Sequence, residues 1–434
     1  MKPNEVIKKL LMRVFKFGGA SVKDAKGVKN LSEIIKNQDE NLIVVISAMG
    51  KTTNAMENLV QAYCDGNTDE LTNCFQLVKQ YHQQISNELL GVESACQIHI
   101  DRLFEQLWSK LQSKPSLNYD FEYDQLVPFG ELLSTAIVSA YLNANGQPNE
   151  WVDIREVLKT DDIYRDAGVD WELTDEMMKE RFRFQNVSLY ITQGFIGSTI
   201  NNLSTTLGRE GSDYTGAIIA HVMDGEYLAI WKDVPGVLNA DPRWYPKAKK
   251  LDELSYWEAI ELTYYGAQVI HPKTLKPLQN KEIPLYVNSF IRPEIKGTVI
   301  RHSELNGEMD PVFILKSNQV IITVSPKDFS FIMEDNLSEI FSIFSRHRVK
   351  MNLMQISALN FSVCVDEKRN LDEVIDELGD RFLTRYNKDV ELLTVRHYTD
   401  EAIREMISNK EVIDSQISRR TARYVVKKSD WNFN

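Results

Sequence analysis

The sequence predicts an α/β protein: an open, mainly parallel sheet with helices on both faces, followed by a region of smaller α+β units. Short apolar runs such as Val14–Phe17 and Leu42–Ser47 alternate with longer helical stretches as far as residue 300. This alternation is typical of β-α-β units, whose parallel strands are covered by helices. The polar stretch Ser303–Asp310 ends at Pro311 and is typical of a linker, after which the elements become shorter.

Length, composition and charge fit this architecture. The 434 residues exceed what one hydrophobic core usually supports, so two or three domains are expected. Hydrophobic residues make up 43% and charged residues 26%, as in ordinary globular proteins. The net charge of −12 argues against nucleic acid or an anionic membrane as the main partner. Because no apolar run is long enough to span a membrane and Met1–Leu11 lacks the apolar core of a signal peptide, we expect a cytoplasmic protein.

The first domain is expected to cover residues 1–302. Between about residues 54 and 115 the sequence has helical periodicity and almost no strand signal, which predicts a helical insertion after the second strand. The strands of the sheet are predicted at Val14–Phe17, Leu42–Ser47, Trp151–Asp153, Leu189–Gln193, Tyr227–Lys232 and Leu285–Val287.

The C-terminal region, residues 303–434, is expected to hold two ferredoxin-like units. The first, at about 320–388, has the β-α-β-β-α order of that fold, with a last strand near Val390–Val395. The second is abbreviated: residues 389–428 supply one helix and a hairpin, and a strand at 311–318 crosses over to complete it. Helices are predicted at Ser338–Arg346, Leu371–Leu378 and Thr399–Ile407, and strands at Val320–Val324, Lys350–Ile356, Asn360–Val365, Val412–Ser418 and Arg420–Lys427.

A lysine before a glycine pair marks the first candidate site. Lys16 ends the first strand and precedes Gly18 and Gly19, and a helix is expected to begin near Ser21. Two glycines let backbone N–H groups approach an anion closely, and a helix N-terminus adds its positive end, so the segment suits a phosphate. It is not a P-loop, because in that motif the lysine follows the glycines. On its own the pattern is more often a plain chain reversal.

Two further clusters follow a predicted strand or open a predicted helix. Ser47–Asn54, directly after the second strand, offers small hydroxyl groups and a glycine that suit either a polar ligand or an ordinary helix cap. Glu131 opens an apolar helix, where the helix dipole alone would explain a glutamate.

The segment with the most polar residues is Thr205–Gly216, at the start of a predicted helix. Its Arg209 suits a carboxylate through a bidentate fork, and its Asp213 can orient a lysine or an amino group. A last segment, Trp231–Arg243, leaves a strand through a Pro-Gly turn and fits either a nucleotide pocket or a plain turn.

Together these segments carry a family resemblance. In chain order, KFGGASV, SAMGKTTN, FGELLST, ITQGFIGS, TTLGREGSDYT, WKDVPGVLNADPR and GAQVIHPKTL resemble the aspartate kinases of the amino acid kinase family. The resemblance covers the chain from Arg13 onward, and the ferredoxin-like units resemble the paired ACT domains attached to those kinases. It implies transfer of the γ-phosphoryl group of Mg-ATP to the side-chain carboxylate of L-aspartate, which gives 4-phospho-L-aspartate, the first step toward lysine, threonine and methionine.

Phosphorylation of a carboxylate places simple demands on a site. A carboxylate is already a nucleophile at neutral pH, so catalysis reduces to placing two anions in line and neutralising the transferring group. Lys16 is the candidate for that neutralisation, and the resemblance implies that Asp213 holds it in place. It assigns the aspartate pocket to Ser47, Thr53, Glu131, Phe195, Arg209 and Ser212, with Glu131 on the ammonium and Arg209 on a carboxylate. It assigns the nucleotide to Gly18, Gly19, Ser21, Lys232, Asp233 and Arg243.

No metal cluster is predicted in the protein itself. Cys64, Cys74, Cys96 and Cys364 have no metal-ligand spacing and are expected to be reduced thiols. Mg²⁺ is therefore expected to arrive with ATP and to stay largely water-bound.

Several positions depart from the family pattern. On the nucleotide side, Lys232 stands where a small hydroxyl residue is usual, Leu238 where a tyrosine is frequent, and Gln268 where a lysine commonly reaches phosphate. We hypothesise that Lys232 supplies the charge that Gln268 lacks. In the regulatory region, the turn Met333–Leu337 lacks the usual glycine, and Asn352 replaces an aspartate that would pair with a lysine ammonium.

The resemblance implies further partners and leaves alternatives. ACT units commonly pair their sheets, so we expect a homodimer, and an amino acid effector is a partner that the resemblance allows. A kinase for glutamate, acetylglutamate, carbamate or uridylate would share Lys16 but not the linked Glu131 and Arg209 motifs. A non-catalytic amino acid sensor would have little reason to keep these residues. A dehydrogenase would need Gly-x-Gly-x-x-Gly after the first strand, where it is absent.

Overall fold

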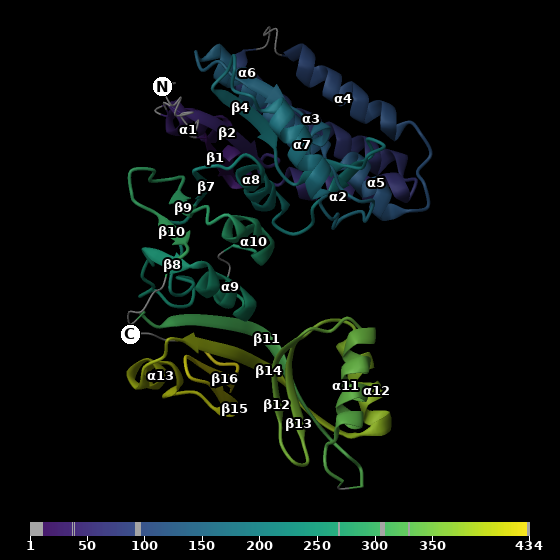
Figure 1. Ribbon diagram of the computed structural model, residues 1–434. Helices are drawn as coiled ribbons and strands as arrows, with labels where there is room; N and C mark the ends of the chain where they lie inside the picture. Colours follow the sequence, from purple (N-terminus) through teal and green to yellow (C-terminus); the bar gives the residue numbers. More distant parts are fainter. Residues whose placement is uncertain are drawn as a thin grey trace, which may run out of the picture. The chain divides into compact units, whose positions relative to one another are not determined.

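The computed structural model describes residues 12–36, 38, 40–91, 97–267, 270–303, 309–328 and 330–431. The chain divides into two compact units, each built around its own sheet (Figure 1). The first unit combines Met1–Val237, Leu251–Ile260 and Ile270–Glu304, and the second combines Leu238–Lys250, Glu261–Val269 and Leu305–Asn434. The predicted boundary at residue 302 thus assigned to the first domain two stretches, 238–250 and 261–269, that cluster with the second unit.

An eight-stranded sheet forms the centre of the first unit. Its order is β3-β4-β2-β1-β7-β9-β10-β8, and every neighbouring pair is parallel except β9 with β10. The central strands are almost continuously apolar because helices cover both faces of a parallel sheet. The strands are β1 (Met12–Phe17), β2 (Asn41–Ile46), β3 (Glu150–Val152), β4 (Leu189–Gln193), β7 (Tyr227–Lys232), β8 (Glu253–Ser255), β9 (Leu285–Ser289) and β10 (Thr298–Arg301).

In the stretch where a helical insertion was predicted, the first unit has the helices α2 (Thr52–Cys64), α3 (Thr68–Leu90) and α4 (Gln97–Leu111). Within the described residues one stretch, Tyr119–Ala144, is long and apolar enough to cross a membrane, but 89% of its apolar window is buried inside the protein. The remaining elements are the 3₁₀ turns η1 (Gly19–Val22) and η2 (Ile154–Glu156), the hairpin β5 (Ile196–Ser198) and β6 (Ser204–Thr206), and the helices α1 (Ala25–Lys36), α5 (Tyr119–Leu126), α6 (Phe129–Ala144), α7 (Trp171–Arg181), α8 (Gly211–Val222), α9 (Tyr256–Tyr265) and α10 (Pro272–Asn280).

The second unit is a six-stranded antiparallel sheet with the order β12-β13-β11-β14-β16-β15. Two of its strands, β11 (Val312–Ser325) and β14 (Leu383–Arg396), are 14 residues long and serve both ferredoxin-like halves. The other elements are α11 (Glu334–Arg346), β12 (Met351–Ile356), β13 (Phe361–Asp366), α12 (Leu371–Arg381), α13 (Asp400–Ile407), β15 (Val412–Ile417) and β16 (Thr421–Lys427). The predicted fold class, an α/β unit followed by two ferredoxin-like units, is confirmed.

The strand predicted to cross over is present, although as one half of a longer strand. Residues 312–316 pair with 392–396, and residues 319–325 pair with 383–390, so β11 continues from one half into the other. A register shift after Lys316 accommodates the polar residues Ser317 and Asn318, and Asn318 has φ +55°. These polar residues interrupt the apolar pattern, which is why the sequence predicted two separate strands.

The abbreviated half completes its core with a segment from outside the C-terminal region. Its one helix, α13, contributes Ala402 and Met406 to a cluster that also contains Tyr245. The Tyr245 ring lies 5.1 Å from that of Phe313, centroid to centroid. The stretch 238–250 therefore contributes core side chains to the half that has only one helix.

Candidate active site

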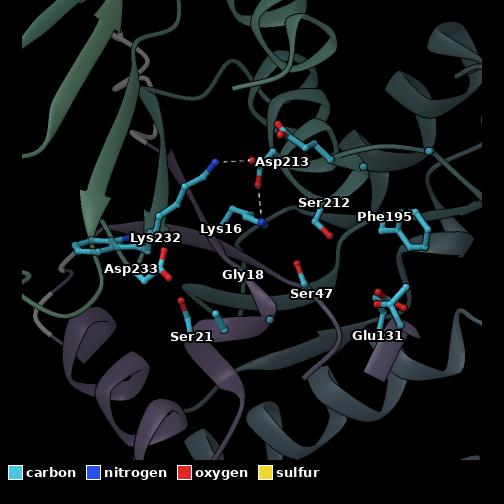
Figure 2. A pocket seen from close by; sticks show the side chains of 17 residues that line it. Lys16, Gly18, Ser21, Ser47, Glu131, Phe195, Ser212, Asp213, Lys232 and Asp233 are labelled. Carbon is cyan, nitrogen blue, oxygen red and sulfur yellow. Dashed lines mark ion pairs between the residues drawn. The ribbon is translucent and has the colours of Figure 1, made fainter. Parts of the chain in front are cut away.

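A cavity of about 400 Å³ opens in the first unit, where β1, β2 and β7 reach their carboxyl ends (Figure 2). Parallel strands end at the same edge of a sheet, so residues far apart in the sequence meet there. Twelve of the fourteen predicted site residues line this cavity: Lys16, Gly18, Gly19, Ser21, Ser47, Thr53, Glu131, Phe195, Ser212, Asp213, Lys232 and Asp233.

Two lysines share one buried aspartate at the cavity. Lys16 Nζ lies 2.5 Å from Asp213 Oδ1, and Lys232 Nζ lies 3.5 Å from Asp213 Oδ2, as the dashed lines in Figure 2 show. Burial alone would raise the pKa of Asp213, but the two ammonium groups outweigh it and the pKa is lowered. Asp213 is therefore ionised, and the three side chains together carry one net positive charge into the cavity.

The glycine turn after β1 packs closely against the loop after β2. A Cβ on Gly19 would lie 2.5 Å from the carbonyl oxygen of Ala48, and the N–H of Gly50 donates to the Gly19 carbonyl at 2.9 Å. Gly18 is less crowded: its Cβ would meet the Lys16 ammonium at 3.7 Å. Gly19 is thus required by packing between the two loops, whereas Gly18 keeps the backbone open beside the lysine.

Glu131 is a buried carboxylate in the first turn of α6. Its Oε1 accepts a long hydrogen bond of 3.4 Å from the N–H of Ala48, while Oε2 is buried without a hydrogen-bond partner among the described residues. Burial raises the pKa of Glu131 to about 8, and the nearby backbone N–H groups only partly oppose this. A buried, incompletely paired carboxylate is destabilising unless a ligand pairs with it, and a cationic group is the matching ligand.

Phe195 and the start of α8 form a strained wall of the cavity. Phe195 has φ +73°, and its N–H donates to Thr215 Oγ1 at 3.0 Å. Its ring is packed against Gly211, where a Cβ would lie only 2.8 Å from a ring carbon. The glycine at the first position of α8 therefore lets the aromatic wall and the helix start meet.

The two predicted arginines do not line the cavity. Arg209 is exposed, although its neighbours Gly208 and Glu210 line it. Arg243 is exposed and pairs with Asp241 at 2.5 Å, in the stretch 238–250 that belongs to the second unit. Leu238 lies in the same stretch and bridges to Lys250, while Gln268 lies outside the described residues.

Five residues of the cavity were not selected from the sequence: Ala20, Gly208, Glu210, Gly211 and Trp231. Four of them belong to the glycine turn or the Thr205–Gly216 cluster. The sequence analysis thus selected these two segments as candidate sites but did not select these four residues within them. Trp231 fits the apolar pattern of β7, and its ring stacks on that of Phe17 at 6.0 Å. The apolar pattern of the strand already explains this tryptophan, so nothing in the sequence indicates that it also lines the cavity.

No metal centre accompanies these residues in the part of the chain that the structure describes. No three His, Cys, Asp or Glu side chains lie close enough there to share an ion.

Comparison with known proteins identifies the family. The model of the amino acid kinase family matches residues 12–289. Lysine-sensitive aspartokinase 3 of Escherichia coli K12 is 32% identical over 359 residues, which is 81% of this chain and 78% of that protein. The chain belongs to the aspartokinases of the amino acid kinase family. Aspartokinase 1 of Arabidopsis thaliana chloroplasts is 31% identical over 395 residues, covering 86% of this chain and 68% of that protein.

Solved aspartokinases share the whole architecture. The E. coli aspartokinase III structure with lysine and aspartate superimposes with a TM-score of 0.81 at 26% identity and covers 96% of both chains. The structure of the same E. coli enzyme with aspartate and ADP gives a TM-score of 0.78 at 26% identity and the same coverage. The chain therefore has both the α/β unit and the C-terminal ferredoxin-like units that these solved structures contain.

Replacing Glu131 with glutamine should flatten the pH dependence of stability. Between the ordinary pKa of 4.5 and about 8, the folded protein keeps a proton that the unfolded chain has lost, so stability falls as pH rises through this window. The fall is at most about 1.4 kcal/mol per pH unit. Glu131→Gln has no group to titrate there and should lose this slope, which thermal unfolding at several pH values between about 5 and 8 would measure.

A matched control for this measurement is Glu105→Gln on the exposed face of α4. That variant should keep the wild-type slope. Equal slopes for the wild type and Glu131→Gln would contradict a buried, titrating Glu131.

Proposed function

We propose that this aspartokinase transfers the γ-phosphoryl group of ATP to the side-chain carboxylate of L-aspartate, giving 4-phospho-L-aspartate for lysine, threonine and methionine biosynthesis. One observation carries the proposal. A single cavity has a cationic end, where Lys16 and Lys232 share Asp213, and an acidic end at Glu131, whose buried carboxyl group gains a reason to ionise when a cation binds beside it. An amino acid with an acidic side chain matches both ends of the cavity. Its ammonium group would pair with Glu131, and its side-chain carboxylate would face the ATP phosphate that the two lysines hold.

The aspartate side follows from the charges around Glu131. The substrate ammonium would pair with the buried Glu131 carboxylate, and this pairing would lower the pKa that burial has raised. The hydroxyl groups of Ser47 and Ser212 and the ring of Phe195 would enclose the carbon chain. Arg209 would clamp a carboxylate of the substrate from the turn that precedes α8.

The phosphoryl transfer itself needs placement and charge rather than a base. The aspartate carboxylate would attack the γ-phosphorus directly, while Lys16 neutralises the oxygens of the transferring group. Asp213 fixes the position of the Lys16 ammonium through the 2.5 Å ion pair. Because Asp213 stays ionised, it accepts no proton during the reaction and acts through geometry and charge alone.

The nucleotide side uses the other rim of the cavity. Backbone N–H groups at Gly18 and Gly19 and the Ser21 hydroxyl would meet the ATP phosphates, with Lys232 and Asp233 beside them. Mg²⁺ would arrive with ATP, stay largely water-bound and supply positive charge beside the phosphates. Arg243 remains a predicted nucleotide contact.

A cytoplasmic location of the protein also remains a prediction.

Removing the lysines separates their roles. Lys16→Ala should reduce aspartate-dependent ADP release on the order of a hundredfold or more, because the charge at the transfer point is lost. Lys232→Thr should chiefly raise the KM for ATP. A coupled ADP assay with and without aspartate measures the rate of ADP release and the KM for ATP. The control is Lys36→Ala, which removes an exposed lysine on α1 and should match the wild type. A wild-type protein without aspartate-dependent ADP release would refute the proposed function, and an unchanged ATP KM in Lys232→Thr would refute the role of Lys232.

We also propose a homodimer formed through the second unit. β12 is an edge strand of the six-stranded sheet, and it exposes the apolar side chains of Met354 and Ile356. The segment beside it exposes Phe331 and Met333 and is tied to the turn after β12 by the N–H of Ile332, which donates to Ala358 O. An exposed apolar strand edge of this kind is suited to pairing with a second copy.

Light scattering after size exclusion would test the dimer. At micromolar concentration the wild type should have twice the monomer mass, and Ile356→Lys on β12 should shift it toward the monomer. Ile98→Lys, at an exposed position of α4 in the first unit, is the matched control and should stay dimeric. A monomeric wild type would rule the dimer out.

The side-chain oxygen of Asn352 is already hydrogen-bonded within the chain, so it is not available to the ammonium group of a lysine ligand. The Oδ1 atom of this buried residue accepts from Lys316 Nζ at 2.8 Å. Its Nδ2 donates to Gln319 Oε1 at 2.8 Å and to Asp366 Oδ1 at 2.9 Å. We infer that Asn352 is a structural residue whose polar atoms are satisfied within the chain, so an amino acid effector, where one acts, does not bind through it.

Titration with amino acids would test this inference. Any change that millimolar L-lysine or L-threonine makes to the aspartate-dependent rate should be the same in the wild type and in Asn352→Ala. Inhibition by lysine that disappears in Asn352→Ala would overturn the inference.

A further inference from the structure

Glu210 has a backbone conformation that its residue type does not favour. It stands at the N-cap of α8 with φ +54° and ψ +27°, the left-handed region that residues with a Cβ adopt at a cost. Its side chain makes no capping hydrogen bond to α8, so helix capping does not explain it. Strained backbone that persists beside a binding cavity suggests that the side chain has another role.

The carboxylate of Glu210 reaches a second helix. Its Oε2 accepts a hydrogen bond of 2.8 Å from the backbone N–H of His271, which is the N-cap of α10. The start of a helix carries unpaired N–H groups and the positive end of the helix dipole, so an anionic acceptor is favourable there. Glu210 therefore joins the N-terminal ends of α8 and α10, two helices that pack against each other.

A second contact connects α10 to the same turn. Lys273, in the first turn of α10, forms an ion pair with Asp166, and its Nζ lies 3.5 Å from the carbonyl oxygen of Leu207. Asp166 in turn packs against Gly208, where a Cβ would lie 2.7 Å from its Oδ1. The turn of residues 208–211 is thus attached to α10 on its N-terminal side through Lys273 and on its C-terminal side through Glu210.

The position of this turn decides what the cavity presents to a substrate. The Glu210 carbonyl accepts from the N–H groups of Asp213 at 3.0 Å and Tyr214 at 3.1 Å, so it begins the helix that carries Ser212 and Asp213 into the cavity. Arg209 lies on the same turn, one residue earlier. A shift of the Glu210 backbone would therefore move the proposed aspartate clamp and the first turn of α8 together.

We propose that Glu210 is a positioning residue for aspartate binding, which acts by holding the strained turn of residues 208–211 against the N-terminus of α10. The proposal rests on the proposed function. The hydrogen bond to His271 compensates the unfavourable φ, and without it the turn relaxes away from the geometry that aspartate requires. The role needs an acceptor at the end of the side chain rather than a negative charge.

Two variants of the full chain test the proposal through kinetics. Glu210→Ala removes the acceptor and should raise the KM for aspartate on the order of tenfold or more, with the KM for ATP changed less than about twofold. Glu210→Gln keeps an amide oxygen that can accept the His271 N–H, so it should restore the aspartate KM to near the wild-type value. Hydrogen exchange at the His271 amide should be faster in Glu210→Ala and protected again in Glu210→Gln, which is a readout independent of activity.

A cap variant outside the cavity is the matched control. Asp170 caps α7 by accepting from the N–H of Leu173 at 3.1 Å, and it does not line the cavity. Asp170→Ala should lower the melting temperature without changing the aspartate KM. If Asp170→Ala raises the KM as much as Glu210→Ala does, the effect follows stability alone and the proposal is overturned.

The remaining outcomes are equally decisive. A wild-type aspartate KM in Glu210→Ala would overturn the proposal, and so would a Glu210→Gln variant as impaired as Glu210→Ala, since the charge and not the hydrogen bond would then matter. A wild-type enzyme that ignores aspartate would refute the proposed function instead. In that case unchanged exchange at His271 in Glu210→Ala would still overturn the positioning role.

Discussion

Asp213 binds an ammonium group on each of its carboxylate oxygens, and this buried interaction fixes the spacing of β1, β7 and α8. Lys16 comes from the end of β1 and Lys232 from the end of β7, so the ion pairs hold two neighbouring strands and a helix in one arrangement. Burying the charges of Lys16 and Asp213 is expensive, and the cost is offset only when the geometry of the pairs is good. The parallel sheet supplies that geometry because its strand ends meet at one edge.

Glu131 is the electrostatic counterpart of this cluster. It lies in α6, where 12 of the 16 residues are buried, and its Oε2 atom has no hydrogen-bond partner among the described residues. An apolar core helix would be more stable with an apolar residue there. The protein therefore carries a local loss of stability at the site where the proposed substrate ammonium would bind, and binding would recover it.

The sequence predicted the elements whose signal is local and missed those that depend on tertiary structure. Long amphipathic helices and apolar strands were found with small errors at their ends. The polar clusters that follow strands or open helices were found from local pattern, and the family resemblance selected the twelve cavity residues. The continuity of β11 was missed because Ser317 and Asn318 interrupt its apolar pattern. Glu210 was missed because nothing in a linear sequence reveals a positive φ or an acceptor for the distant His271 N–H. Family resemblance supplied the identity of the substrate, which periodicity could not.

The second unit shows how a fold can be shortened without losing its core. Because β11 and β14 each pair along their full length, the two ferredoxin-like halves share one hydrogen-bonded ladder. The half that has only α13 gains Tyr245 from the stretch 238–250, which leaves the first unit after Val237 and returns at Leu251. The N–H of Leu251 donates to the carbonyl of Val237 at 2.8 Å, so this stretch is a closed loop at its base. The segment that follows β7 and Lys232 in the chain is therefore also part of the core of the second unit, and a substitution at Tyr245 would act on that core rather than on the eight-stranded sheet.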